Sequence, residues 1–163
     1  MNQNNRLLLI YKSVERLGGM MHLGIAGADE PTGPYRRLRD EPIFVADKLG
    51  DHVEDPFFWH DRGTYHVIMK AMKGRLGGEP RGGISIETAD VLHWPRPEVA
   101  VERAYSRHVR WDDGSMTTQS FLERPHLLIE EGKPTHLFAA TAIGSDAIGH
   151  VTDSWNMVIP LRS

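Results

Sequence analysis

The sequence of 163 residues predicts an all-β fold, and three observations carry this prediction. Short runs rich in β-branched, aromatic and aliphatic residues recur along the chain, and turn formers such as Gly, Pro and Asp bound each run. No window of about a dozen residues shows a helical period, and Ser13–Leu17 could form one turn at most. A motif that occurs twice further indicates that the strands belong to repeated sheets.

The apolar runs predict nine strands. In order, these cover Leu7–Ser13, Met21–Ala26, Tyr35–Leu38, Pro56–His60, Tyr65–Ala71, Gly83–Thr88, Pro125–Ile129, Thr135–Thr141 and Asn156–Leu161. Two triplets that end in glycine, Asp61–Gly63 and Glu130–Gly132, are typical of hairpin connections. The runs on either side of each triplet should therefore pair as antiparallel strands.

The sequence contains an internal repeat that begins with a Glu-x-Pro triplet. Glu54–Pro56 and Glu123–Pro125 each precede an apolar run, and in both copies a glycine follows nine positions after the Glu. A weaker third copy is Leu7–Ser13, which ends in Lys12-Ser13 as the later run ends in Lys70-Ala71. A repeating unit of roughly 40–50 residues is typical of the four-stranded blades of a β-propeller.

We expect one incomplete propeller domain over residues 1–163, with about two to three four-stranded blades. Residues 1–45 would form a partial blade without its innermost strand, residues 53–103 a full blade, and residues 109–163 another. Propellers usually close with four to eight blades, and an open stack leaves strand edges exposed. We therefore expect the sequence to begin partway through a longer protein, with missing N-terminal blades or self-association completing the fold. A small β-sandwich or a split sheet is the alternative.

Composition and charge exclude several classes of function. The net charge of −3 and the pI near 6.3 do not suggest a nucleic-acid surface. Because the sequence has no cysteine, disulfides, thiolate zinc sites and a cysteine nucleophile are excluded. The first apolar run, Leu7–Ile10, is too short for a signal peptide or a membrane span, so we expect no membrane contact. The cellular compartment stays open.

No cofactor or metal is expected. The nine histidines form neither a His-Glu-x-x-His motif nor a tight cluster with Asp. The glycine-rich stretch Gly74–Gly83 has neither the dinucleotide-binding spacing nor the Gly-Lys-Ser/Thr of a phosphate-binding loop. We interpret this stretch as a long flexible loop between strands, at the rim of the propeller funnel.

Asp55 and Glu123 are the residues best suited to chemistry, because each immediately precedes a predicted inner strand. The starts of inner strands point into the central funnel of a propeller, so carboxylates from adjacent blades should converge there. Glycoside hydrolysis needs two carboxyl groups, one to protonate the leaving oxygen and one to activate water or attack the sugar. The alternative is structural, since Asp-Pro is common in turns and the repeated Glu-x-Pro could punctuate each blade.

Several motifs resemble those of the five-bladed propeller glycoside hydrolases, the group that contains family 43 and its relatives. Val53–Phe57, followed by Asp61-x-Gly63-x-Tyr65, resembles their second acidic motif, and Glu123–His126 resembles their third, a Glu-x-Pro. Further short similarities lie at Ala26–Tyr35, Ser85–Trp94, Tyr105–Arg107, Trp111–Gly114 and Pro134–Ala140. The order and spacing of these motifs carry the resemblance over most of the sequence.

The resemblance implies roles for individual residues. It makes Glu123 the general acid and Asp55 the residue that orients and tunes this acid. The family's third carboxylate, the base or nucleophile, comes from the first blade, and no motif before residue 53 matches it. Some relatives hold a cation in the central channel, but no residues of this sequence support one.

Five further residues are candidates for substrate binding. Arg124 and His126 flank the proposed acid and could bind sugar hydroxyls or a carboxylate, or could form structural ion pairs instead. Lys70 could border the pocket. His108 and Trp111 lie in a loop-like segment between blades, where the indole could stack on a sugar ring or pack over the blade.

The leading hypothesis is a glycosidase fragment that cleaves an oligo- or polysaccharide by carboxylate acid/base catalysis. Non-catalytic carbohydrate binding is the alternative, because the first acidic residue is missing and these 163 residues alone could be inactive. A propeller glycoside phosphorylase is a further alternative, for which Arg124 and Lys70 are the only suggestive groups. The sugar, the linkage and the stereochemical outcome stay open.

Overall fold

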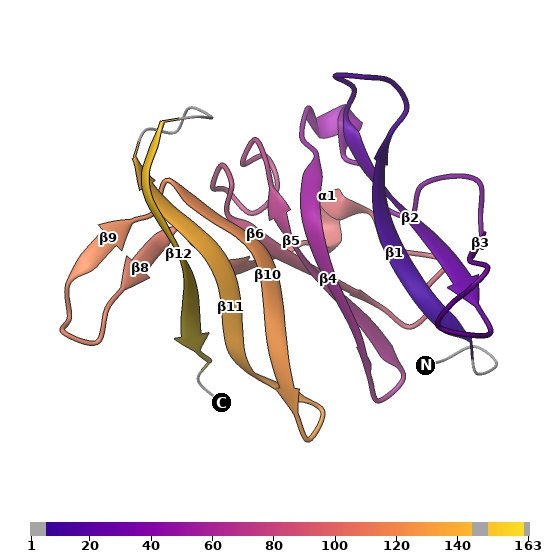
Figure 1. Ribbon diagram of the computed structural model, residues 1–163. Coiled ribbons are helices and arrows are strands. Elements are labelled where there is room, and N and C mark those ends of the chain that lie inside the picture. The colour runs from indigo at the N-terminus through magenta and orange to yellow at the C-terminus, as the bar shows by residue number, and fades with distance from the viewer. Residues whose placement is uncertain (1–5, 145–149, 162–163) are drawn as a thin grey trace.

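The computed structural model describes residues 6–144 and 150–161, and within these ranges the protein is all-β (Figure 1). Its strands form three antiparallel sheets and a separate two-stranded hairpin. The helical segments of the described ranges are two single turns, the 3-10 turn η1 (Asp47–Leu49) and α1 (Pro97–Ala100). The polar N-terminal residues 1–5 lie outside the described ranges.

Each sheet is built from strands that follow one another in the sequence, so neighbours in sequence are neighbours in the sheet. The first sheet contains β1 (Leu7–Val14), β2 (Met21–Ala28) and β3 (Arg36–Arg37). The second sheet contains β4 (Val53–Asp61), β5 (Thr64–Ala71), β6 (Gly83–Thr88) and β7 (Glu102–Tyr105). The third sheet contains β10 (Phe121–Glu130), β11 (Lys133–Gly144) and β12 (Val151–Pro160), and the separate hairpin contains β8 (His108–Arg110) and β9 (Met116–Thr118).

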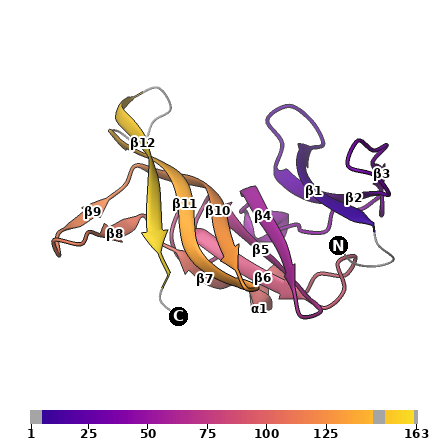
Figure 2. The ribbon, with the colours of Figure 1, turned by 60° about the horizontal axis from the view of Figure 1, so that its bottom comes forward.

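The three sheets stand side by side as consecutive blades of a partial β-propeller (Figures 1 and 2). The first strands of the second and third sheets, β4 and β10, contact one another, and β1 contacts β4 from the other side. The hairpin of β8 and β9 projects away from the blades beyond β12 in both views. The sheet of β10–β12 has three strands, and residues 108–118 form this separate hairpin.

All nine predicted strands exist, and the sequence pattern missed β7, β8 and β9. These three strands are only three or four residues long and mostly polar and exposed, so they carry no hydrophobic alternation. Of the predicted run Tyr35–Leu38, only Arg36 and Arg37 are paired. The stretch after β1 turns without forming a helix, as the absence of a helical period predicts.

The repeated Glu-x-Pro motif forms a β-bulge inside a strand, which corrects the prediction that Asp55 and Glu123 precede their strands. The register breaks between Glu54 and Phe57 in β4 and between Glu123 and His126 in β10. Proline has no N–H to donate to a ladder, so within a strand it is tolerated at a bulge. Each strand therefore starts earlier than its apolar run suggests and continues through the proline.

Strand β5, an inner strand of the second sheet, is buried on both faces and contributes to both hydrophobic cores. Val67 and Met69 belong to a core shared with the first sheet, which includes Leu23 and Ile25. Ile68 belongs to the core shared with the third sheet. Side chains alternate between the faces of a strand, so residue 70 lies on the face of Ile68 and points toward the third sheet.

A buried carboxylate binds the first residues of the glycine-rich loop between β5 and β6, and the flexibility of the rest of this loop stays a prediction. Asp51 is 0% exposed, and its Oδ1 accepts hydrogen bonds from the backbone N–H groups of His52 and Lys73 at 2.8 and 2.7 Å. Its Oδ2 accepts from Arg75 and Leu76 at 2.8 and 3.2 Å. Three of these four N–H groups belong to the loop, so charge-assisted bonds fix the backbone at its start.

Candidate functional site

The candidate site lies where the bulges of β4 and β10 face each other, at one end of two adjacent blades. The bulges place Asp55 and Arg124 in the left-handed region, with φ of 55° and 54°. Asp55 and Arg124 are thus equivalent positions of the repeat, as are Glu54 and Glu123. The positive-φ conformation of a residue other than glycine costs free energy, and residues in this conformation concentrate at functional sites.

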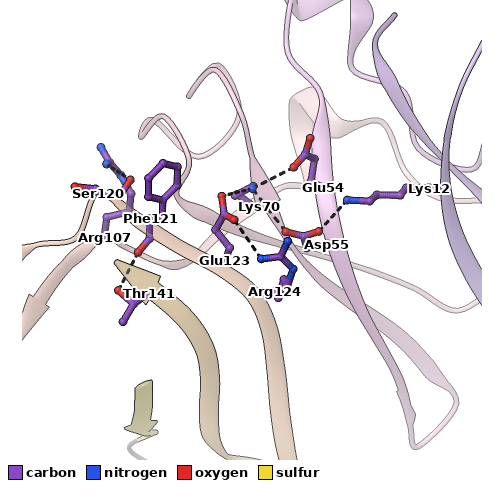
Figure 3. A network of polar contacts seen from close by, with 10 residues as sticks. All are labelled: Lys12, Glu54, Asp55, Lys70, Arg107, Ser120, Phe121, Glu123, Arg124 and Thr141. Atoms are coloured by element: carbon purple, nitrogen blue, oxygen red, sulfur yellow. Dashed lines mark hydrogen bonds and ion pairs between the residues drawn. The ribbon is translucent and has the colours of Figure 1, made fainter. Parts of the chain in front are cut away.

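Lys70 is the centre of the site, because one ammonium group joins carboxylates from two blades (Figure 3). Its Nζ donates a hydrogen bond to Glu123 Oε1 of the neighbouring blade at 2.7 Å. The same atom lies 3.1 Å from Glu54 Oε2 and 3.6 Å from Asp55 Oδ2. The Lys70 side chain is only 2% exposed, so these three ion pairs replace the water that it loses on burial.

Two further cations complete the network around the carboxylates. Lys12, from β1 of the first blade, donates a hydrogen bond to Asp55 Oδ1 at 3.0 Å. Arg124 Nη1 lies 3.5 Å from Glu123 Oε2, and the side chain of Arg124 is 71% exposed. Lys12 and Lys70 occupy matching ends of β1 and β5, so the repeat places each lysine against an acidic bulge residue of the next blade.

The charges around Asp55 and Lys70 stabilise their ionised forms. Burial alone would raise the pKa of Asp55, but the hydrogen bond from Lys12 and the charges of Lys70, Lys12 and Arg124 hold it below its ordinary value. Burial alone would lower the pKa of Lys70, but the hydrogen bond to Glu123 and the surrounding carboxylates raise it. Both directions favour the charged forms of Asp55 and Lys70.

Tyr105, the last residue of β7, lies close behind the carboxylates. Burial raises the pKa of its phenol, and the negative charges of Asp55 and Glu123 raise it further. The Tyr105 ring also lies over Gly83, its cross-strand partner, where a side chain at residue 83 would collide with it. Glycine is therefore required at position 83 for the ring to reach this place.

A cavity of about 490 Å³ opens beside the network, which is large enough for a sugar unit. Its lining includes the three carboxylates and the three cations named above, together with Arg81 from the glycine-rich loop. The guanidinium carbon of Arg81 lies 5.0 Å from the centroid of the Phe121 ring, a cation–π distance. The remaining lining residues are Met72, Ala140, Thr141, Ala142, Val151 and Ser154.

Of the residues that the sequence singled out, Asp55, Glu123, Arg124 and Lys70 come together at this cavity. Three others lie elsewhere. His126 is exposed and packs edge-on against Phe57, with ring centroids 4.4 Å apart. His108 and Trp111 lie in the projecting hairpin, where their ring nitrogens bond Thr118 Oγ1 at 2.8 Å and Thr117 Oγ1 at 2.7 Å.

Sequence reasoning missed the contributions of Glu54, Lys12 and Arg81. The repeat contained the signal for two of them, since Glu54 matches Glu123 and Lys12 matches Lys70. Nothing local marks Arg81, because the buried Asp51 that anchors its loop is distant in sequence. In the described ranges, no group of three His, Cys, Asp or Glu side chains could hold a metal ion. No helix in these ranges is long and apolar enough to cross a membrane.

Comparison with solved structures identifies glycoside hydrolases as structural neighbours. A complex of BT0996 and RGII superposes with a TM-score of 0.60 at 10% identity, over 97% of this protein and 41% of that one. A thermostable family-43 glycoside hydrolase gives 0.54 at 15% identity, over 95% and 47%. The Bombyx mori GH32 β-fructofuranosidase BmSUC1 gives 0.57 at 14% identity, over 99% and 33%.

These similarities establish the fold, a partial β-propeller of the kind found in glycoside hydrolases. The 163 residues span less than half the length of each of the three proteins. No protein-family model matches the sequence, and no curated protein matches it.

Proposed function

We propose that this protein forms part of the active site of a propeller glycosidase, with Glu123 as general acid and Asp55 as the residue that orients it. The observation that carries the proposal is the convergence of both carboxylates on Lys70 Nζ, from two adjacent blades, beside a cavity of about 490 Å³. A glycosidase needs carboxyl groups that flank one bond, and positions on rigid strands hold them there.

The structural neighbours support the reaction class, since glycoside hydrolases share this propeller fold. Fold alone does not determine activity, so the residues of the site must carry the argument. The third carboxylate that the resemblance calls for would come from a strand beside β1. Within the described ranges β1 pairs only with β2, which leaves its other edge for such a strand.

The test is hydrolysis of a panel of plant, algal and host oligosaccharides by the full-length protein and by its Glu123→Gln variant. We expect the variant to lose at least about 100-fold in kcat, because the proton donor of the reaction is removed. Glu131→Gln is the matched control, since Glu131 is exposed in the turn at the far end of the same strand. Full activity of Glu123→Gln would refute the role assignment.

Carbohydrate binding without turnover is the second candidate, and the unmatched third carboxylate favours it. A complete protein that binds oligosaccharides but hydrolyses none, with binding that depends on cavity residues, would select this function. Turnover that requires inorganic phosphate would instead assign the site to a phosphorylase.

A further inference from the structure

In the first two blades, the repeat places a lysine next to an acidic bulge residue of the following blade. Lys12 of β1 donates a hydrogen bond to Asp55 at 3.0 Å, and Lys70 of β5 donates one to Glu123 at 2.7 Å (Figure 3). In each pair the lysine belongs to one blade and the carboxylate to the next. A strict repeat would place a third lysine at the same position of the third blade.

The third blade has an alanine at this position. Lys70 is the cross-strand partner of Glu54, and Ala140 is the cross-strand partner of Glu123. Because Glu54 and Glu123 are equivalent positions of the two bulges, Lys70 and Ala140 are equivalent as well. The series of lysines therefore ends beside the proposed general acid.

The alanine leaves space that a lysine would fill. Ala140 lines the cavity of about 490 Å³. A lysine there would stand opposite Glu123 as Lys70 stands opposite Glu54, where Nζ lies 3.1 Å from Oε2. Its four-carbon stem and its ammonium group would then occupy the part of the cavity next to the proposed acid.

The neighbours of Ala140 are also small. Ala142 lies two residues further along β11, so its side chain is on the same face as that of Ala140. Ser154 of β12 is the cross-strand partner of Ala142, and both residues line the cavity. Glu123 belongs to the same sheet, and its side chain is 20% exposed. A ligand in this part of the cavity would lie beside Glu123.

We propose that Ala140 is a specificity-determining residue: it keeps the cavity open beside Glu123, and one sugar unit of the substrate packs over its methyl group. The inference rests on the proposed function for the class of ligand and adds the place where one sugar unit binds. Ligand pockets combine apolar surface with a few polar groups that fix orientation. Ala140, Ala142 and the hydroxyl of Ser154 provide this combination next to the proposed acid.

Isothermal titration calorimetry of the full-length protein tests the proposal without requiring turnover. The probes are trisaccharides of glucose, xylose, arabinose, galactose and galacturonic acid. Ala140→Lys and Ala140→Met should each weaken binding of the preferred probe by about tenfold or more, because each fills the space of the sugar ring. Ala140→Ser, which keeps the residue small, should change binding by less than about twofold. Unchanged binding in Ala140→Met would overturn the proposal, because this variant fills the space without adding a charge.

Ile143→Lys is the matched control. Ile143 is 40% exposed, lies on the opposite face of β11 and is outside the lining of the cavity. This variant adds the same charge to the same strand and should bind the preferred probe as the wild type does. Weaker binding in Ile143→Lys, as large as in Ala140→Lys, would overturn the assignment to the cavity.

A crystal structure of the Ala140→Lys variant gives a result that does not depend on a ligand. We expect the new ammonium group at position 140 to lie within about 4 Å of a Glu123 carboxylate oxygen, inside the cavity. An ammonium group directed out of the cavity would overturn the equivalence of positions 70 and 140.

Three outcomes separate this inference from the proposed function. Binding that both Ala140→Lys and Ala140→Met weaken, without hydrolysis of any probe, would refute the glycosidase proposal alone. Hydrolysis that both variants retain at the wild-type kcat/KM would refute this inference alone. A wild-type protein that binds none of the probes would refute both.

Discussion

At the scale of single residues, Lys70 is the central residue of the site, because its ammonium group pairs with all three carboxylates. The sequence identified it only as a side chain that could border a pocket. Its strand is apolar on both faces, so no alternation revealed where residue 70 points. In the structure the side chain is buried and joins acids from two blades, which makes it a positioning residue for Glu123 and Asp55.

Replacement of Lys70 by Met should destabilise the protein by about 3 kcal/mol, because it leaves partly buried carboxylates without their shared cation. Chemical denaturation measures the change in the free energy of unfolding. Lys133→Met, at an exposed position of β11, should change it by less than about 0.5 kcal/mol. A loss of similar size in both variants would mean that the network adds nothing to stability.

Asp55 should make stability depend on acid pH. Its pKa is lower in the folded state than in the unfolded protein, where an aspartate has a pKa of about 3.9. The stability from its ion pairs is therefore complete above that value and is lost as the pH falls through the folded-state pKa. The free energy of unfolding should fall less steeply between about pH 5 and 2 in Asp55→Asn than in the wild type or in the exposed Asp40→Asn control. Identical pH profiles would contradict the assignment.

At the scale of elements, long strands and hairpins followed from apolar runs and turn formers. The bulges could not be predicted from the sequence, because Asp-Pro and Arg-Pro pairs are typical of strand boundaries. Only the pairing with the neighbouring strand shows that the hydrogen-bond ladder continues past each proline. The role of Asp51 could not be predicted either. A single Asp before an apolar run does not indicate that its side chain is buried or that it binds a loop roughly 20 residues away.

Removal of the Asp51 side chain should release the loop that carries Arg81. Asp51→Ala leaves four backbone N–H groups without their acceptor, and we expect a loss of about 3 kcal/mol or more in the free energy of unfolding. Hydrogen exchange of the amides of Lys73, Arg75 and Leu76 should accelerate in this variant and remain unchanged in the Asp40→Ala control. Unchanged protection of these amides would show that Asp51 does not hold the loop.

The close approach of Tyr105 to Gly83 predicts a coupled pair. Gly83→Ala should cost about 1–3 kcal/mol, because the new methyl group overlaps the ring, and much less in a Tyr105→Ala background. Gly63→Ala, where the space is open and only the positive φ is strained, should add to Tyr105→Ala without coupling. A double-mutant cycle measures both cases, and additivity at position 83 would contradict the contact.

At the scale of the whole molecule, the repeat predicted the architecture and the pairing of acids across two blades. The two Glu-x-Pro copies lie at equivalent bulges, and Lys12 and Lys70 lie at equivalent strand ends. The placement of the projecting hairpin could not be predicted, because its strands are short and polar. His108 and Trp111 lie there, away from the cavity of Asp55 and Glu123.

The most direct test of the account is a crystal structure of the full-length Glu123→Gln variant with a bound oligosaccharide. The account predicts a sugar in the cavity beside Lys70, with a glycosidic oxygen within hydrogen-bond distance of residue 123 and with Asp55 next to residue 123. A sugar bound instead against Trp111 of the hairpin, with the cavity occupied only by solvent, would contradict the assignment of the site.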